Sequence, residues 1–157
     1  MLHWLWLSTL VLILDQASKW LASAHLAFQQ PLPVVPGFFN LTLAHNRGAA
    51  FSLFHDASGW QRWLFVTLAL TISAILMVWL ARLRHGQHWL AASLALIIGG
   101  AVGNLIDRLR LGYVIDFLDV YVGRYHWPTF NVADSAISVG AAILLILTFR
   151  GTPAGPR

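Results

Sequence analysis

The chain has 157 residues, of which 58% are hydrophobic and only 10% are charged, and its formal net charge is +4. With a mean hydropathy of +0.67, this composition is that of an integral membrane protein with one domain, and it excludes a soluble binding module. The small, scattered positive charge argues against nucleic-acid binding, and the lack of cysteine excludes disulfides, thiolate metal sites and a cysteine nucleophile.

Four apolar segments follow one another along the chain, at approximately residues 4–26, 60–83, 89–107 and 132–149. Each approaches the roughly 20 residues that a helix needs to cross a bilayer. We therefore predict a mainly α integral membrane protein with four transmembrane helices, in which residues 1–157 form a single membrane-embedded domain. The first segment has a sequence like a signal-peptide cleavage site at residues 22–24. We nevertheless expect a retained helix, because no Lys or Arg precedes the apolar run and Asp15 interrupts it.

The connection between the first two segments has the pattern of a small β-sheet. Three prolines between residues 31 and 36 disfavour a helix there. Residues 39–45 alternate apolar side chains with polar or small ones, a turn is expected at 46–48, and residues 49–54 are expected to form a return strand. We predict a small extracytoplasmic sheet between helices 1 and 2, in a β-rich segment covering approximately residues 37–57.

Arginines do not decide the orientation in the membrane. The link at residues 82–86 and the tail at 150–157 each carry two arginines, which favours the cytoplasmic side for both. The opposite connections also carry arginines: Arg47, Arg62, Arg108, Arg110 and Arg124.

All six acidic residues are aspartates. Those in or beside apolar segments are Asp15, Asp107, Asp116, Asp119 and Asp134. A carboxylate in such a place costs several kcal/mol unless it is paired or hydrated, so these residues are functional candidates.

Several polar residues have the spacing of neighbours on one helix face. Asp15 and Lys19 are i and i+4, with the acid in the favourable N-terminal position. Asn104 and Arg108 have the same spacing, with Asp107 beside them. These pairs fit structural support of a helix at least as well as direct chemistry. Asn131 and Asp134, at i and i+3, fit either a helix N-cap or an ionised acid near the positive end of the helix dipole.

Asp116 and Asp134 are the candidate catalytic pair. The stretch from 111 to 130 leaves the third segment and returns to the fourth, so a hairpin-like return can bring the two acids together at the same depth. Two close carboxylates tend to share a proton, and one then activates water while the other protonates the substrate. That is aspartic-protease chemistry. A proton relay, an ion site and helix capping remain alternatives at this point.

Other catalytic motifs are missing. The sequence contains no HExxH and no Gly-x-Ser-x-Gly, and its histidines have no ligand spacing, so no metal and no cofactor are expected. Ser18 is adjacent to Lys19 and points elsewhere on a helix, which disfavours a serine–lysine dyad. The glycine-rich residues 99–103 fit close helix contact better than a phosphate loop.

Five sequence blocks resemble the bacterial lipoprotein signal peptidase family, also called signal peptidase II. The blocks are residues 15–19 (DQASK), 40–41 with 45–52 (NL, HNRGAAFS), 99–108 (GGAVGNLIDR), 114–117 (VIDF) and 130–137 (FNVADSAI). They occur in the family's order and spacing and cover nearly the whole chain.

The resemblance implies an aspartic endopeptidase that removes signal peptides from prolipoproteins by cleaving before the diacylglyceryl-modified cysteine. It implies a multi-pass protein of the bacterial inner membrane, with both termini cytoplasmic and the active site near the periplasmic or outer face. Its expected partners are prolipoprotein substrates and membrane lipid, with no nucleic acid; a monomer is compatible with the sequence, which does not decide the oligomeric state.

By the same analogy, Asp116 and Asp134 are the catalytic residues. Residues that bind substrate or support the site would be Asp15, Lys19, Asn46, Gly48, Asn104, Arg108 and Asn131. Asp119, three residues after Asp116, competes as a second acid. The rival function is a membrane carrier or proton-relay subunit, which the gathering of polar groups near one surface disfavours.

Overall fold

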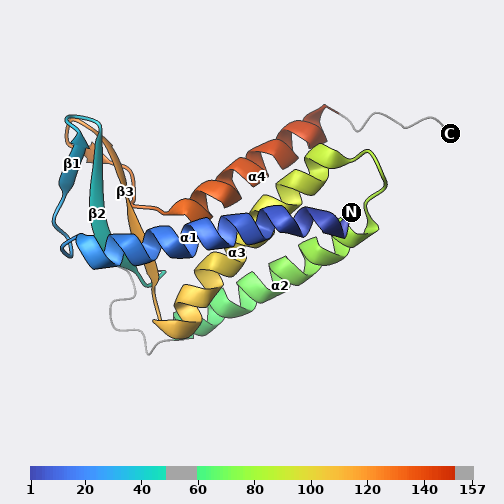
Figure 1. Ribbon diagram of the computed structural model, residues 1–157, viewed down its shortest axis with the longest axis horizontal. Coiled ribbons are helices and arrows are strands. Elements are labelled where there is room, and N and C mark those ends of the chain that lie inside the picture. The colour runs from blue at the N-terminus through green and yellow to red at the C-terminus, as the bar shows by residue number, and fades with distance from the viewer. Residues whose placement is uncertain (49–59, 151–157) are drawn as a thin grey trace.

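The computed structural model describes residues 1–48 and 60–150, which form a helical bundle with a small sheet at one end (Figure 1). The predicted return strand at 49–54 lies outside the described residues. The elements in chain order are η1 (Leu2–Trp4), α1 (Leu5–His25), β1 (Leu32–Val35), β2 (Phe39–Asn46), α2 (Trp60–Arg82), α3 (His88–Arg110), β3 (Val114–Val122), β4 (Tyr125–His126) and α4 (Val132–Phe149).

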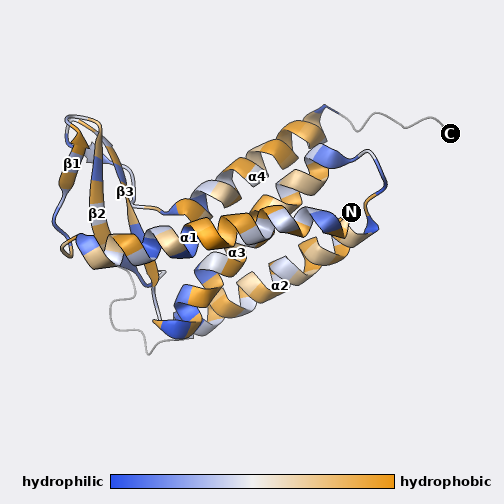
Figure 2. Cartoon of the chain, viewed as in Figure 1, coloured by the Kyte–Doolittle hydropathy of each residue, from blue (hydrophilic) through white to orange (hydrophobic). Residues whose placement is uncertain are grey.

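The helices α2, α3 and α4 are long and apolar enough to cross a membrane. Apolar colour runs along the middle of the bundle, and hydrophilic residues gather toward its two ends (Figure 2). The predicted helical segments match these helices closely, and α1 lies where the first was expected. The crossing of the membrane by α1, which carries Asp15 and Lys19, remains a prediction.

Helix α3 is the centre of the bundle. It contacts α1, α2 and α4, and 56% of its most apolar 18-residue stretch is buried, compared with 17% in α2 and in α4. Exposed apolar side chains such as Ile75 on α2 and Leu145 on α4 are suited to face lipid.

Glycines allow the helices to approach α3 closely. A Cβ atom at Gly99 would lie 2.8 Å from the backbone oxygen of Ser8 on α1. A Cβ atom at Gly140 of α4 would lie 2.7 Å from the backbone oxygen of Ser93 on α3. The small residues at 99–103 therefore serve helix contact, as their sequence indicated.

The sheet is antiparallel with the strand order β1-β2-β3-β4. A small antiparallel sheet was expected, but its placement between helices 1 and 2 was wrong in one respect: β3 and β4 follow α3. The return from 111 to 130 thus supplies half of the strands. Strand β3 pairs with β2, so that Ala44 lies opposite Asp116 and Asn40 lies opposite Asp119.

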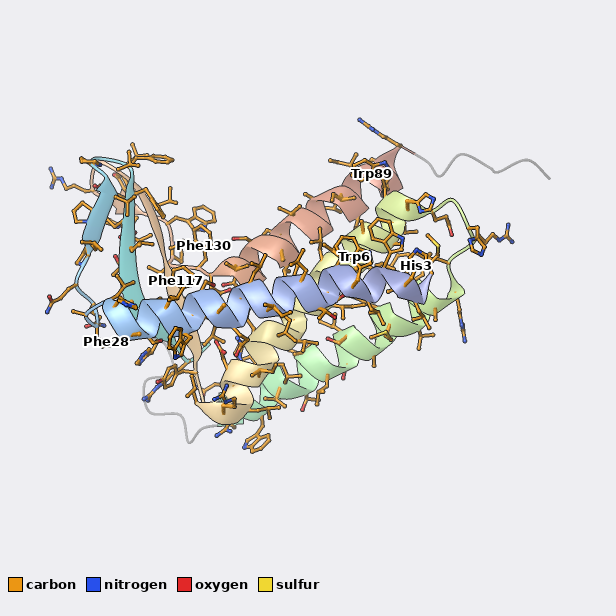
Figure 3. The ribbon with its side chains drawn as sticks, in the orientation of Figure 1. His3, Trp6, Phe28, Trp89, Phe117 and Phe130 are labelled. Atoms are coloured by element: carbon orange, nitrogen blue, oxygen red, sulfur yellow. The ribbon has the colours of Figure 1, made fainter. Side chains whose placement is uncertain are left out.

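The sheet joins the bundle where α1 and α3 end and α4 begins (Figure 1). In Figure 3, Phe28, Phe117 and Phe130 lie at this end, while His3, Trp6 and Trp89 lie at the other. The N-terminus and the end of α4 are both at the end of the bundle away from the sheet. The fold therefore brings β2, β3 and three helix ends together at one place.

Candidate active site

Asp116 lies on β3 with its side chain almost completely buried, at 1% exposure. Its Oδ1 atom accepts a hydrogen bond from Asn131 Nδ2 at 2.7 Å, and its Oδ2 atom accepts one from Asn46 Nδ2 at 3.0 Å. Both donors are neutral amides, and among the residues that the structure describes no cation forms an ion pair with this carboxyl group. Amide donors orient the group without supplying a full counter-charge.

Asp134 lies in the first turn of α4. Asn131 is the N-cap residue: its Oδ1 atom accepts from the backbone N–H of Asp134 at 2.9 Å, and the Asp134 Oδ2 atom accepts from the backbone N–H of Asn131 at 3.3 Å. Asn104 Nδ2 donates to Asp134 Oδ1 at 2.7 Å. The N-cap role of Asn131, one of the two alternatives that the sequence left open, is observed, and the same residue forms hydrogen bonds with both aspartates.

Burial raises the pKa of Asp116 to about 6, and the negative charge of Asp134 acts in the same direction. Hydrogen bonds from Asn46 and Asn131, and the more distant charge of Lys19, oppose this rise. Asp116 and Asp134 therefore interact electrostatically, as two carboxyl groups that share a site do.

A buried ion cluster lies behind the two aspartates. Lys19 Nζ contacts Asp15 Oδ2 at 2.8 Å and Asp107 Oδ2 at 2.9 Å, and it donates to Asn104 Oδ1 at 3.0 Å. Asp15 Oδ1 accepts from the backbone N–H of Ala133 at 2.9 Å. The cluster thus joins α1 and α3 to the start of α4, and the predicted Asp15–Lys19 pair is confirmed as part of a larger network.

Arg108 and Gly48 lie where the site meets α2. The Arg108 guanidinium is 5.1 Å from the centre of the Phe65 ring, and its Nη1 atom donates to the Asn104 backbone oxygen at 3.3 Å. Gly48 has a φ of +86°, and a Cβ atom there would overlap the Phe65 ring. Its N–H donates to Asn46 Oδ1 at 2.8 Å, which orients the Asn46 amide toward Asp116.

Asp119 lies on the opposite face of β3, because it is three positions after Asp116 and side chains alternate along a strand. Its carboxylate contacts His126 Nδ1 at 2.8 Å, Asn40 Nδ2 at 3.0 Å and Thr42 Oγ1 at 3.2 Å. Burial alone would raise the pKa of Asp119, but these hydrogen bonds hold it below its ordinary value. The competing second acid is therefore engaged elsewhere on the sheet.

The family model for signal peptidase (SPase) II matches residues 7–150, which is most of the chain and includes every candidate residue. The chain belongs to the signal peptidase II family. Membership makes it a peptidase and disfavours the carrier hypothesis.

Curated relatives resemble this chain over most of their length. A lipoprotein signal peptidase of Pseudomonas paraeruginosa (strain DSM 24068 / PA7) is 53% identical over 155 residues, covering 98% of this chain and 92% of the relative. The lipoprotein signal peptidase of Acinetobacter baylyi (strain ATCC 33305 / BD413 / ADP1) is 54% identical over 148 residues, covering 94% of this chain and 82% of the relative.

Two solved structures of bacterial membrane enzymes have a similar fold. One superposes with a TM-score of 0.86 at 28% identity, covering 97% of this chain and 96% of the solved one. The other has a TM-score of 0.85 at 27% identity and covers 100% and 93% of the two chains. The arrangement of helices and sheet is thus that of a bacterial membrane enzyme.

Two contributors to the site were not among the candidates. Gln16 Nε2 donates to Asp107 Oδ1 at 3.0 Å, and Phe65 lies under Arg108. Asp107 was a functional candidate because a buried acid needs a partner, and that partner is Lys19. Phe65 carries no such signal in an apolar helix.

Proposed function

We propose that this signal peptidase II is an aspartic endopeptidase that cleaves prolipoproteins before the diacylglyceryl-modified cysteine, with Asp116 and Asp134 as its catalytic dyad. The observation that carries the proposal is that one residue, Asn131, forms hydrogen bonds with both carboxyl groups. The names of the curated relatives support the substrate class.

In the resting dyad, Asp134 is the ionised member and Asp116 holds the proton. The first turn of α4 favours negative charge on Asp134, because backbone N–H groups and the helix dipole point at it. The pKa of Asp116 is raised to about 6 by burial first and then by the charge of Asp134. On these two grounds we assign Asp134 as the base and Asp116 as the acid.

Catalysis then proceeds by general acid and base steps. Asp134 takes a proton from water, and the resulting hydroxide attacks the carbonyl carbon of the scissile bond. Asp116 donates its proton to the carbonyl oxygen, which would otherwise carry negative charge in a buried site. When the C–N bond breaks, Asp134 gives its proton to the leaving amine, and Asp116 takes a proton from the gem-diol hydroxyl as the new carboxyl group forms. The dyad thereby returns to its starting protonation state.

The neighbouring residues hold this geometry. Asn46, Asn104 and Asn131 donate to the two carboxyl groups and prevent them from rotating. Asp15 and Lys19 fix Asn104 and the start of α4 from behind. Arg108 and Gly48 border the site on the side of α2, where they would contact the substrate backbone.

We also propose a placement in the membrane that is compatible with this arrangement. The protein would lie in the bacterial inner membrane with α1 as a fourth span, both termini cytoplasmic, and the sheet and dyad near the outer face. The diacylglyceryl chains of the substrate would remain in lipid, beside the exposed apolar side chains of the bundle. A single copy contains every residue that the proposal uses.

Cleavage by purified protein in lipid tests the proposal. The substrates are a diacylglyceryl-modified prolipoprotein and its unlipidated twin, and the variants are Asp116→Asn and Asp134→Asn. We expect wild type to cut only the lipidated form and each variant to lose at least about 10³-fold in rate. Asp119→Asn is the matched comparison, because it replaces a buried carboxylate on the other face of the same strand, and it should retain far more activity. Turnover near wild type in Asp116→Asn or Asp134→Asn would refute the dyad.

A further inference from the structure

Strand β2 contains one extra residue relative to β3. Asn40 and Leu41 lie opposite Asp119 and Leu118, but the next pair joins Ala44 to Asp116, so the register changes between Leu41 and Ala44. This is a β-bulge, in which two residues of one strand oppose one of the other.

The bulge decides which side chain faces Asp116. Directly opposite residues of an antiparallel pair point to the same face, and side chains alternate along each strand. With the bulge, Ala44 and therefore Asn46 share the face of Asp116, and the Asn46 amide forms its 3.0 Å hydrogen bond. Without it, Leu43 would lie opposite Asp116, and His45 would take the place of Asn46.

The bulge is held from both sides by groups outside the dyad. Thr42, inside the bulge, donates its hydroxyl to Asp119 Oδ2 at 3.2 Å, and Asn40, just before it, donates to the same atom at 3.0 Å. The backbone oxygen of Leu43 accepts from the N–H of Gln29 at 2.9 Å. Asp119 is 3% exposed and also contacts His126, so its carboxylate is fixed in place.

We propose that Asp119 is a positioning residue: together with Thr42 it fixes the bulge in β2 that presents Asn46 to Asp116. It touches no reacting atom, and it acts on the reaction through the register of the sheet. The inference rests on the proposed role of Asp116 and extends it to a carboxylate on the opposite face of the sheet.

The test is a double-mutant cycle on the cleavage of a lipidated prolipoprotein by the full chain. Thr42→Val and Asp119→Asn are each made in wild type and in Asn46→Ala. We expect each to lower kcat/KM about tenfold in wild type, the effect of losing one hydrogen bond to a charged or reacting group. In the Asn46→Ala background each should cost less than about twofold, because the contact they protect is already absent.

Two controls separate positioning from general damage. Thr42→Ser keeps the hydroxyl and should restore kcat/KM to within about twofold of wild type. Thr9→Val makes the same change on an exposed face of α1 and should leave kcat/KM unchanged. Elution volume and apparent melting temperature in detergent show which variants are folded. The Thr42→Val substitution itself changes the side-chain volume little.

The pH profile gives a readout that a merely structural role would not move. The Asn46 hydrogen bond lowers the pKa of Asp116, so its loss raises that pKa. We therefore expect the pH above which kcat/KM falls to be higher in three variants: Asn46→Ala, Thr42→Val and Asp119→Asn.

Each outcome separates the two proposals. Equal effects of Thr42→Val in both backgrounds, or no effect in either, would overturn the positioning role while leaving the dyad intact. Turnover by Asp116→Asn, measured in parallel, would overturn the proposed function itself.

Discussion

Lys19 donates a hydrogen bond to Asn104 Oδ1 at 3.0 Å, and the Nδ2 atom of the same Asn104 amide donates to Asp134 Oδ1 at 2.7 Å. A single amide thus separates a buried ammonium from the proposed base. The same ammonium contacts Asp15 and Asp107, so it holds two helices together as well as orienting the site. We therefore expect both stability and activity to depend on this one side chain, which is only 2% exposed.

Lys19→Met should destabilise the protein by about 3–5 kcal/mol, because it leaves Asp15 and Asp107 buried without their cation. Unfolding in detergent, followed by circular dichroism, measures the loss. Lys19→Met combined with Asp15→Asn should recover part of it, since one uncompensated carboxylate is removed. If Lys19→Met alone were as stable as wild type, the ion cluster would not support the fold.

The pH dependence of kcat/KM should report the proton on Asp116. This pKa is raised to about 6, and the proposed mechanism needs the protonated form. Kinetic constants measured at fixed detergent and lipid should therefore show kcat/KM falling as the pH rises through about 6, by up to about tenfold per pH unit beyond it. The fall of kcat should occur at a higher pH than the fall of kcat/KM, because bound substrate excludes water from Asp116 and raises its pKa further. A kcat/KM that instead rises through this range would give the proton to Asp134.

Stability should also depend on the ionisation of Asp116. Its pKa is 3.8 ordinarily and about 6 in the fold, so the folded state binds the proton more tightly. The stabilisation is fully present below about pH 4 and is lost as the pH rises through about 6, amounting to about 3 kcal/mol. The melting temperature of wild type, relative to that of the non-titrating Asp116→Asn variant, should fall across this window. If the melting temperatures of the two proteins changed in parallel with pH, the raised pKa of Asp116 would be contradicted.

Local patterns in the sequence predicted the parts of the molecule that are themselves local. Helix α4 was predicted closely because its length and hydropathy are properties of a continuous segment. The Asp15–Lys19 pair and the Asn131 cap were predicted because i, i+4 and i, i+3 neighbours meet on any helix.

Contacts between distant segments could not be predicted in this way. The pairing of β2 with β3 joins residues about 70 positions apart, and a strand carries no sequence signal for its partner. The bulge between Leu41 and Ala44 has no glycine or other local signature. The residues of the proposed dyad were named from their type and from the family resemblance, whereas the hydrogen bonds that hold Asp116 depend on tertiary structure.

Gly140→Ala tests the close contact between α3 and α4 that places Asp134. The added methyl group would lie 2.7 Å from the backbone oxygen of Ser93, which cannot rotate away, so the two helices must separate. We expect a loss of about 1–3 kcal/mol in unfolding free energy and a lower rate of cleavage, because the Asn104–Asp134 hydrogen bond spans the same two helices. Ala142→Val, which adds bulk at an exposed position of α4, is the matched control and should change neither quantity appreciably. If Gly140→Ala melts and cleaves like this control, the helices do not need the glycine to approach each other.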